Sequence, residues 1–208
     1  MKWSLFVKAA GGCGGATMKL SIKYLKSIGA CSDAVEAFAA QTETNPVKVL
    51  NLCLKKGKID WANWLIVRLL NRKNSIRYAI FAAEKVLPLY EKNYPNDAIP
   101  RKAIEAAIKI LENYTKENRN RAIRAAEAAI RASHAAYAAR AVHLAKVDQA
   151  AADIAEAATR AADSAARAAY AAADVADSAT RAFQAAQSTE PTTKEKIIRY
   201  GIGLFKKQ

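Results

Sequence analysis

The sequence predicts an all-α protein: an N-terminal bundle of short helices, followed by long alanine-rich antiparallel helices packed at close distance. Residues 119–187 are nearly half alanine and contain neither glycine nor proline, and alanine has the highest intrinsic helix propensity. In the other segments, apolar residues recur at helical spacing between residues that typically begin or end helices. Aromatic residues concentrate in the first half, so we expect the core of large side chains to be N-terminal.

Two series of residues spaced by seven run through the alanine-rich region. Seam residues with side chains larger than alanine include Ile123, Ile130, Tyr137, Leu144, Ile154 and Val175. A seam of mostly small side chains with charged flanks is typical of closely packed helices. The seven-residue phase shifts by three between Leu144 and Val147, which indicates either a stammer or a junction. Because a single helix would be about 105 Å long, we expect residues 116–187 to form a hairpin.

The first half should contain six shorter helices. Apolar spacing predicts the first over 18–28, ended by Gly29. Ser32 or Asp33 can cap the second, which extends to about Gln41.

Residues that start and stop helices also place the next two elements. Asn45 and Pro46 have the order expected for the N-cap and first turn of the third helix, and Gly57 follows its end. Asp60 is the expected N-cap of a fourth helix over 61–71.

Proline and serine mark the remaining short helices. Ser75 can cap a fifth helix that extends to about Tyr94, with a kink or break at Pro88. Pro100 opens the sixth, and Thr115 can cap the alanine-rich region. These boundaries define a short-helix bundle over 18–115 that forms one domain with the hairpin.

The two ends of the chain differ in composition from its middle. Residues 1–17 are glycine-rich, and we expect a flexible extension. Residues 188–208 form a basic amphipathic tail, in which a short helix over 194–205 should be broken by Gly201 and Gly203. The tail could touch an anionic surface, but folding back on the core is the favoured alternative.

The net charge of +14 fits either an ordinary solvated basic surface or a surface that binds an acidic partner. A protein with an acidic surface is favoured over nucleic acid, because the chain has no recognisable nucleic-acid motif and no run of more than two basic residues. A homo-oligomer through the alanine seam is possible. No apolar run approaches the roughly 18 residues of a membrane span.

The sequence contains no pattern that indicates catalysis, a metal or a cofactor. His134 and His143 are nine residues apart and do not share a helical face. The carboxylates of Glu105 and Glu127 have no histidine or nucleophile to support acid–base chemistry. Three cysteines without a CxxC pair predict buried or incidental thiols in a reducing, cytoplasmic compartment.

Five residues are candidates for binding a partner: Trp61, Trp64, Arg68, Arg101 and Glu105. Both tryptophans should share a face of the fourth helix with Arg68. They would serve either as interface anchors or as packing between the fourth and fifth helices. Arg68 could pair with Glu84 or Glu105, whereas Arg101 and Glu105 have the i, i+4 spacing of a helical ion pair.

Three segments resemble the alanine-rich "putative immunity protein" family of polymorphic toxin systems, which is also found in phage genomes. They are LKSIGAC at 25–31, DWANWLIVRLLNR at 60–72, and RKAIEAAIKILEN at 101–113, just after Pro100. The alanine repeats further along the chain are similar to those of this family. The resemblance implies an all-helical protein that neutralises a toxin by binding it.

Two functional hypotheses follow. The first is a non-enzymatic immunity-type protein that occludes an acidic toxin or effector with a basic helical face. The alternative is a phage-encoded structural, virion or counter-defence protein that acts through helix-mediated assembly, and that protein would be virion-associated.

Overall fold

The computed structural model describes residues 18–125, 127–128, 160 and 191–208. These residues are mostly helical and include no strand, so the predicted all-α class is confirmed. Of the predicted seam, Ile123 lies in the helical residues 116–125 and is half-buried. The other named seam residues, and the predicted turn of the hairpin, lie outside the described residues.

The first helix begins later than the sequence predicted, whereas the second begins slightly earlier. Helix α1 spans Ile22–Ser27, and the Ser21 hydroxyl accepts a hydrogen bond from the Tyr24 N–H at 3.1 Å. Ser21 has an extended backbone, and the Leu20 N–H before it donates to the Thr44 carbonyl at 2.8 Å. Helix α2 spans Ser32–Ala39, with Cys31 at its N-cap rather than Ser32 or Asp33.

Helix α3, Pro46–Lys55, has the predicted start. The Asn45 side-chain oxygen accepts hydrogen bonds from two backbone N–H groups, at 3.0 and 3.2 Å. Gly57 follows the helix with a positive φ of 68°. Helix α4 spans Ile59–Leu69, two residues earlier than predicted, so Asp60 lies in the first turn and Lys58 is the N-cap.

Helix α5, Arg72–Asn93, is longer than predicted at its start. Asn71, not Ser75, caps it by accepting from the Asn74 N–H at 3.0 Å. The helix also continues through Pro88, so the alternative of a break was wrong. Pro88 and Glu84 are both on the solvent side, where water can satisfy the carbonyl that proline leaves without a donor.

Helix α6, Ile99–Glu112, has Pro100 in its first turn, as predicted. Asp97 joins it to α5: one carboxylate oxygen accepts from the Tyr90 hydroxyl at 2.6 Å, and the other accepts from the Ile99 N–H at 2.8 Å. The Thr115 hydroxyl accepts from the Asn118 N–H at 3.0 Å, so Thr115 caps the next helix as predicted.

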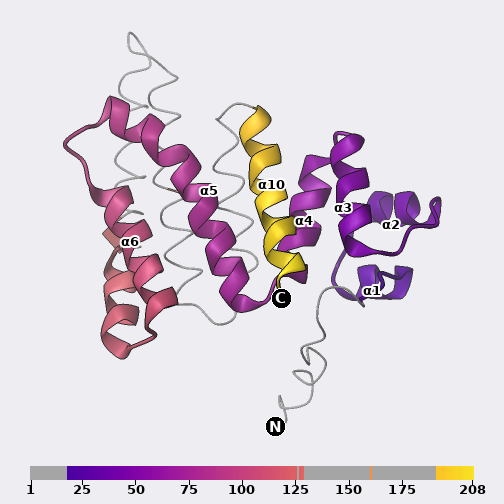
Figure 1. Cartoon of the computed structure of the whole chain (residues 1–208), viewed down its shortest axis with the longest axis horizontal. Helices are drawn as coiled ribbons and strands as arrows, with labels where there is room; N and C mark the ends of the chain where they lie inside the picture. Colours follow the sequence, from indigo (N-terminus) through magenta and orange to yellow (C-terminus); the bar gives the residue numbers. More distant parts are fainter. Residues whose placement is uncertain (1–17, 126, 129–159, 161–190) are drawn as a thin grey trace.

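Helix α10, Pro191–Lys206, is continuous through Gly201 and Gly203, so the predicted break in the tail was wrong. It packs against α3, α4 and α5 and lies between α4 and α5 in Figure 1. The side chains of Ile197, Ile198 and Phe205 are at most 2% exposed. The C-terminal segment therefore folds back and contributes to the core, which is not confined to the first half of the chain.

At Gly201, helix α10 lies close to α5 and α4. A β carbon placed there would lie 2.6 Å from Cε2 of Tyr78 and 3.0 Å from Cγ1 of Ile66. Tyr78 is fully buried, and its hydroxyl donates to the Asn63 side-chain oxygen at 2.8 Å. This bond joins α5 to α4 and fixes the ring against which Gly201 packs, so only glycine fits there.

The side chain of Gln208 ties the end of α10 to the corner between α4 and α5. Its amide nitrogen donates to the Leu69 carbonyl at 2.8 Å. Its amide oxygen accepts from the Asn71 N–H at 3.0 Å and from the Asn74 side chain at 3.2 Å. The Asn74 amide also donates to the Leu204 carbonyl. The backbone groups at this corner are thereby satisfied by a residue that is remote in sequence.

Two glycine substitutions test the packing of α10. We expect Gly201→Ala to destabilise the protein by about 1–2 kcal/mol, because overpacking outweighs the gain in helix propensity. Gly203→Ala is the matched control: no atom lies within 4 Å of its β carbon, so it should be neutral or stabilise by up to about 1 kcal/mol. Urea unfolding followed by circular dichroism measures both. Equal effects of the two substitutions would contradict the close packing.

Candidate partner-binding groove

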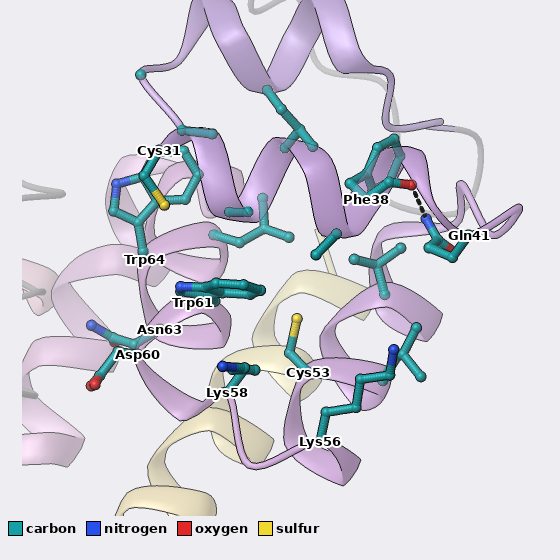
Figure 2. Close-up of a pocket in the computed structure, with 18 residues that line it drawn as sticks. Cys31, Phe38, Gln41, Cys53, Lys56, Lys58, Asp60, Trp61, Asn63 and Trp64 are labelled. Carbon is teal, nitrogen blue, oxygen red and sulfur yellow. Dashed lines mark hydrogen bonds between the residues drawn. The ribbon is translucent and has the colours of Figure 1, made fainter.

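An apolar groove of about 340 Å³ lies between α2, α3 and α4 (Figure 2). Helix α2 and the residues after α1 form one wall, α3 forms a second, and the start of α4 forms a third. The groove is lined by Leu25, Gly29, Ala30, Cys31, Ala34, Ala37, Phe38, Gln41, Val49, Leu52, Cys53, Lys56, Lys58, Asp60, Trp61, Asn63, Trp64 and Leu65.

Trp61 and Trp64 lie on the groove face of α4, as their i, i+3 spacing allows. Both are half-buried. Another side of α4 packs against α5 and α10 through Ile66 and through Asn63, which also lines the groove and accepts a hydrogen bond from the Tyr78 hydroxyl. The tryptophans therefore contact the groove rather than fill the space between α4 and α5. Figure 2 shows the Trp61 ring in the middle of this cavity.

Each indole carries a cation on its face. The Lys58 ammonium lies 4.9 Å from the Trp61 ring centroid, and the Arg68 guanidinium lies 4.2 Å from that of Trp64. Arg68 also donates to the Trp64 carbonyl at 3.1 Å. Such cation–π contacts contribute about 0.5–1 kcal/mol at exposed sites. They hold positive charge beside the aromatic wall of the groove.

The thiols of Cys31 and Cys53 line the groove, and both cysteines are free. Burial raises the pKa of the Cys53 thiol, and the nearby Lys56 lowers it to a smaller extent. Cys53 is therefore a neutral, weakly polar part of the wall at neutral pH. No group of three His, Cys, Asp or Glu residues in the described ranges is arranged to hold a metal ion. Cys13 and both histidines lie outside those ranges.

The turn between α2 and α3 holds two walls of the groove in place. The Gln41 amide nitrogen donates to the carbonyls of Phe38 and Glu43, at 3.2 and 2.7 Å (Figure 2 shows the first). One Glu43 carboxylate oxygen accepts from the N–H groups of Thr44 and Asn45, at 3.0 and 2.8 Å. The other lies 3.2 Å from the Lys48 ammonium. Helix α2 is thereby fixed beside α3, and Phe38 is held at the groove.

The predicted residues Arg101 and Glu105 are not part of the groove. Both are exposed on α6, which lies at the opposite end of the molecule from α2 in Figure 1. Arg101 forms a bidentate pair with Glu91 of α5, with both contacts at 2.6 Å. The predicted i, i+4 pair with Glu105 is replaced, because the turn at 94–98 brings the start of α6 beside the end of α5. Glu105 supplies only a longer-range attraction.

Sequence reasoning found the two tryptophans but missed the other groove residues. In the sequence, Phe38, Leu52 and Cys53 are indistinguishable from the other apolar residues of short helices. Their common orientation depends on how α2 and α3 pack, which local spacing does not reveal. The available signal was the two lysines, Lys56 and Lys58, that flank the glycine turn just before the tryptophans.

Fold and site together define an all-helical protein with an aromatic groove beside a basic corner. No helix in the described residues is long and apolar enough to span a membrane. The model of a family described as Imm-5 like putative immunity protein matches residues 66–144. This match confirms the resemblance to putative immunity proteins that the motifs predicted.

The matched segment begins near the end of α4 and includes α5, α6 and the RKAIEAAIKILEN motif. The LKSIGAC motif and the groove-lining residues precede it. Searches of curated proteins and of solved structures found no match.

The Glu43 turn gives the protein a testable acid sensitivity. Hydrogen bonds from the backbone, the strongest from Asn45, hold the Glu43 pKa below its ordinary value of 4.5. The resulting stability is fully present above pH 4.5 and is lost as the pH falls through the lower folded-state pKa. Glu43→Gln should therefore be less stable than the wild type at pH 7, and the difference should shrink below pH 4.5.

Chemical denaturation at several pH values measures this difference. Glu36→Gln removes an exposed carboxylate on α2, outside the turn, and serves as the charge-matched control. A stability difference for Glu43→Gln that stayed constant from pH 7 to pH 3 would show that the turn does not depend on the ionised carboxylate.

Proposed function

We propose that this protein is a non-enzymatic, immunity-type binding protein that neutralises a toxin or effector by covering its surface. The observation that carries the proposal is the family match over residues 66–144, because an immunity-type role implies a toxin partner. The groove adds a means of binding, since it exposes aromatic side chains next to lysines. The second hypothesis, assembly into a virion structure, draws no comparable support from the described residues.

The mechanism is occlusion by a preformed surface. The described helices are joined by buried contacts and caps, so little conformational entropy is lost when a partner docks on them. The net charge of +14 attracts an acidic surface and speeds the encounter, whereas apolar contacts at the tryptophans slow dissociation. Neutralisation then requires no chemical step, only that the bound chain prevents the toxin from reaching its target.

Capture from the native host tests the function. The tagged full-length chain should recover one stoichiometric protein with an acidic surface, and co-expression of the two should restore growth that the partner alone arrests. Because charge steers the encounter, the Kd should rise about tenfold or more between 50 and 500 mM NaCl.

Two controls accompany the capture. Nuclease treatment of the lysate removes partners bridged by nucleic acid. A parallel capture with a tagged basic protein of similar charge identifies acidic proteins that bind non-specifically. Recovery of capsid or tail proteins alone, or of the chain bound only to itself, would contradict the immunity-type role and favour assembly.

A further inference from the structure

The groove between α2, α3 and α4 is an apolar surface that the described part of the chain leaves open. Trp61, Trp64 and Phe38 line it and are each only half-buried. Concave apolar surfaces exposed on a protein mark interaction sites. The volume of about 340 Å³ is within the range of roughly 300–1,000 Å³ found for ligand-binding pockets. The groove can therefore enclose a large side chain.

Both indole N–H groups remain available to a bound partner. Within the described ranges, Trp61 and Trp64 make cation–π contacts, but neither indole nitrogen donates a hydrogen bond. The indole N–H of a tryptophan that is buried in the core of its own chain usually donates to an acceptor in that chain. The arrangement is typical of an interface in which the ring packs and the N–H meets an acceptor on the partner.

One corner of the groove is positively charged. Lys56 and Lys58 line it, and Asp60 is the one acidic residue among the lining set. Helix α4 begins at the same corner, and no side chain caps its first turn. The unpaired N–H groups of a helix start carry partial positive charge and favour a nearby carboxylate. Aromatic surface, lysines and helix start thus select an apolar group linked to an acidic one.

We propose that the groove binds an amphipathic acidic segment of the partner protein. A large apolar side chain of that segment enters beside Trp61 and Phe38, and an adjacent carboxylate pairs with Lys56 or Lys58. Insertion of an amphipathic segment into an apolar groove is a recurring mode of peptide recognition. The inference rests on the proposed function, since it names the surface and the partner chemistry through which that function operates.

A second copy of the chain is a poorer occupant. Two copies placed groove to groove would bring lysine against lysine, and the chain already carries a net charge of +14. A neutral apolar molecule could fill the cavity but would make no use of the positive charge of Lys56 and Lys58. Charge complementarity therefore favours an acidic protein segment.

Selection of displayed random peptides on the purified full-length chain tests the groove without the native partner. Bound peptides should combine an aromatic or long aliphatic residue with neighbouring Asp or Glu. Ala37→Arg places a long side chain in the groove, and Ala39→Arg makes the same change on α2 outside it. Both alanines are exposed and arginine is a good helix former, so both variants should fold. Ala37→Arg should weaken peptide binding at least tenfold, whereas Ala39→Arg should change it less than twofold.

A second pair of variants tests the charge. Lys58→Glu reverses a groove lysine at the start of α4, and Lys102→Glu reverses an exposed lysine near the start of α6. Acidic residues are tolerated near helix starts, so folding should be preserved in both. Lys58→Glu should weaken binding of the selected acidic peptides at least fivefold, and Lys102→Glu should have little effect on that binding.

Three outcomes would overturn the groove proposal. The first is recovery of no peptide sensitive to Ala37→Arg. The second is selection of basic or uncharged peptides. The third is self-association of the chain that Ala37→Arg abolishes.

The experiments distinguish failure of the groove proposal from failure of the proposed function. A native partner that binds wild type and Ala37→Arg equally would leave the immunity-type role standing and remove the groove from it. If the capture finds no toxin-like partner, the proposed function is rejected. The peptide selection still tests whether the groove binds acidic segments.

Discussion

The described structure depends on the close approach of α10 to α4 and α5 at Gly201. The glycine packs against the fully buried ring of Tyr78, whose hydroxyl is held by Asn63. At the end of the same helix, the Gln208 side chain satisfies backbone groups at the α4–α5 corner. The C-terminal segment is therefore the central helix of the bundle, and it joins elements that are more than a hundred residues away in sequence.

This packing gives α4 two separate roles. Ile66 packs beside Gly201 of α10, and Asn63, which also lines the groove, accepts a hydrogen bond from Tyr78 of α5. Trp61 and Trp64 line the groove with α2 and α3. Because the inner face anchors the helix, the outer face can expose aromatic rings without loss of order. A binding surface built on such a supported helix is preorganised, which reduces the entropy lost on association.

The family match and the groove occupy adjoining parts of the chain. The match covers residues 66–144 and so includes α5, which packs against α10 and α6 and is joined to α4 by the Tyr78–Asn63 hydrogen bond. The groove residues precede the match, and α4 runs from one region into the other. In the proposed function, the matched region supports the surface and the preceding helices supply the contacts.

Local features of the sequence determined the helical class and several helix boundaries. The Asn45–Pro46 start, the glycine stop at Gly57 and the Thr115 cap depend on residues within one turn, so the sequence alone predicts them. Only the tertiary structure decided that α10 continues through its glycines and that Arg101 pairs with Glu91. It also decided that the tryptophans face α2 and α3, because all three features depend on contacts between different helices. Propensity and capping act within a few residues, whereas burial chooses which faces meet and overrides the local cost of glycine.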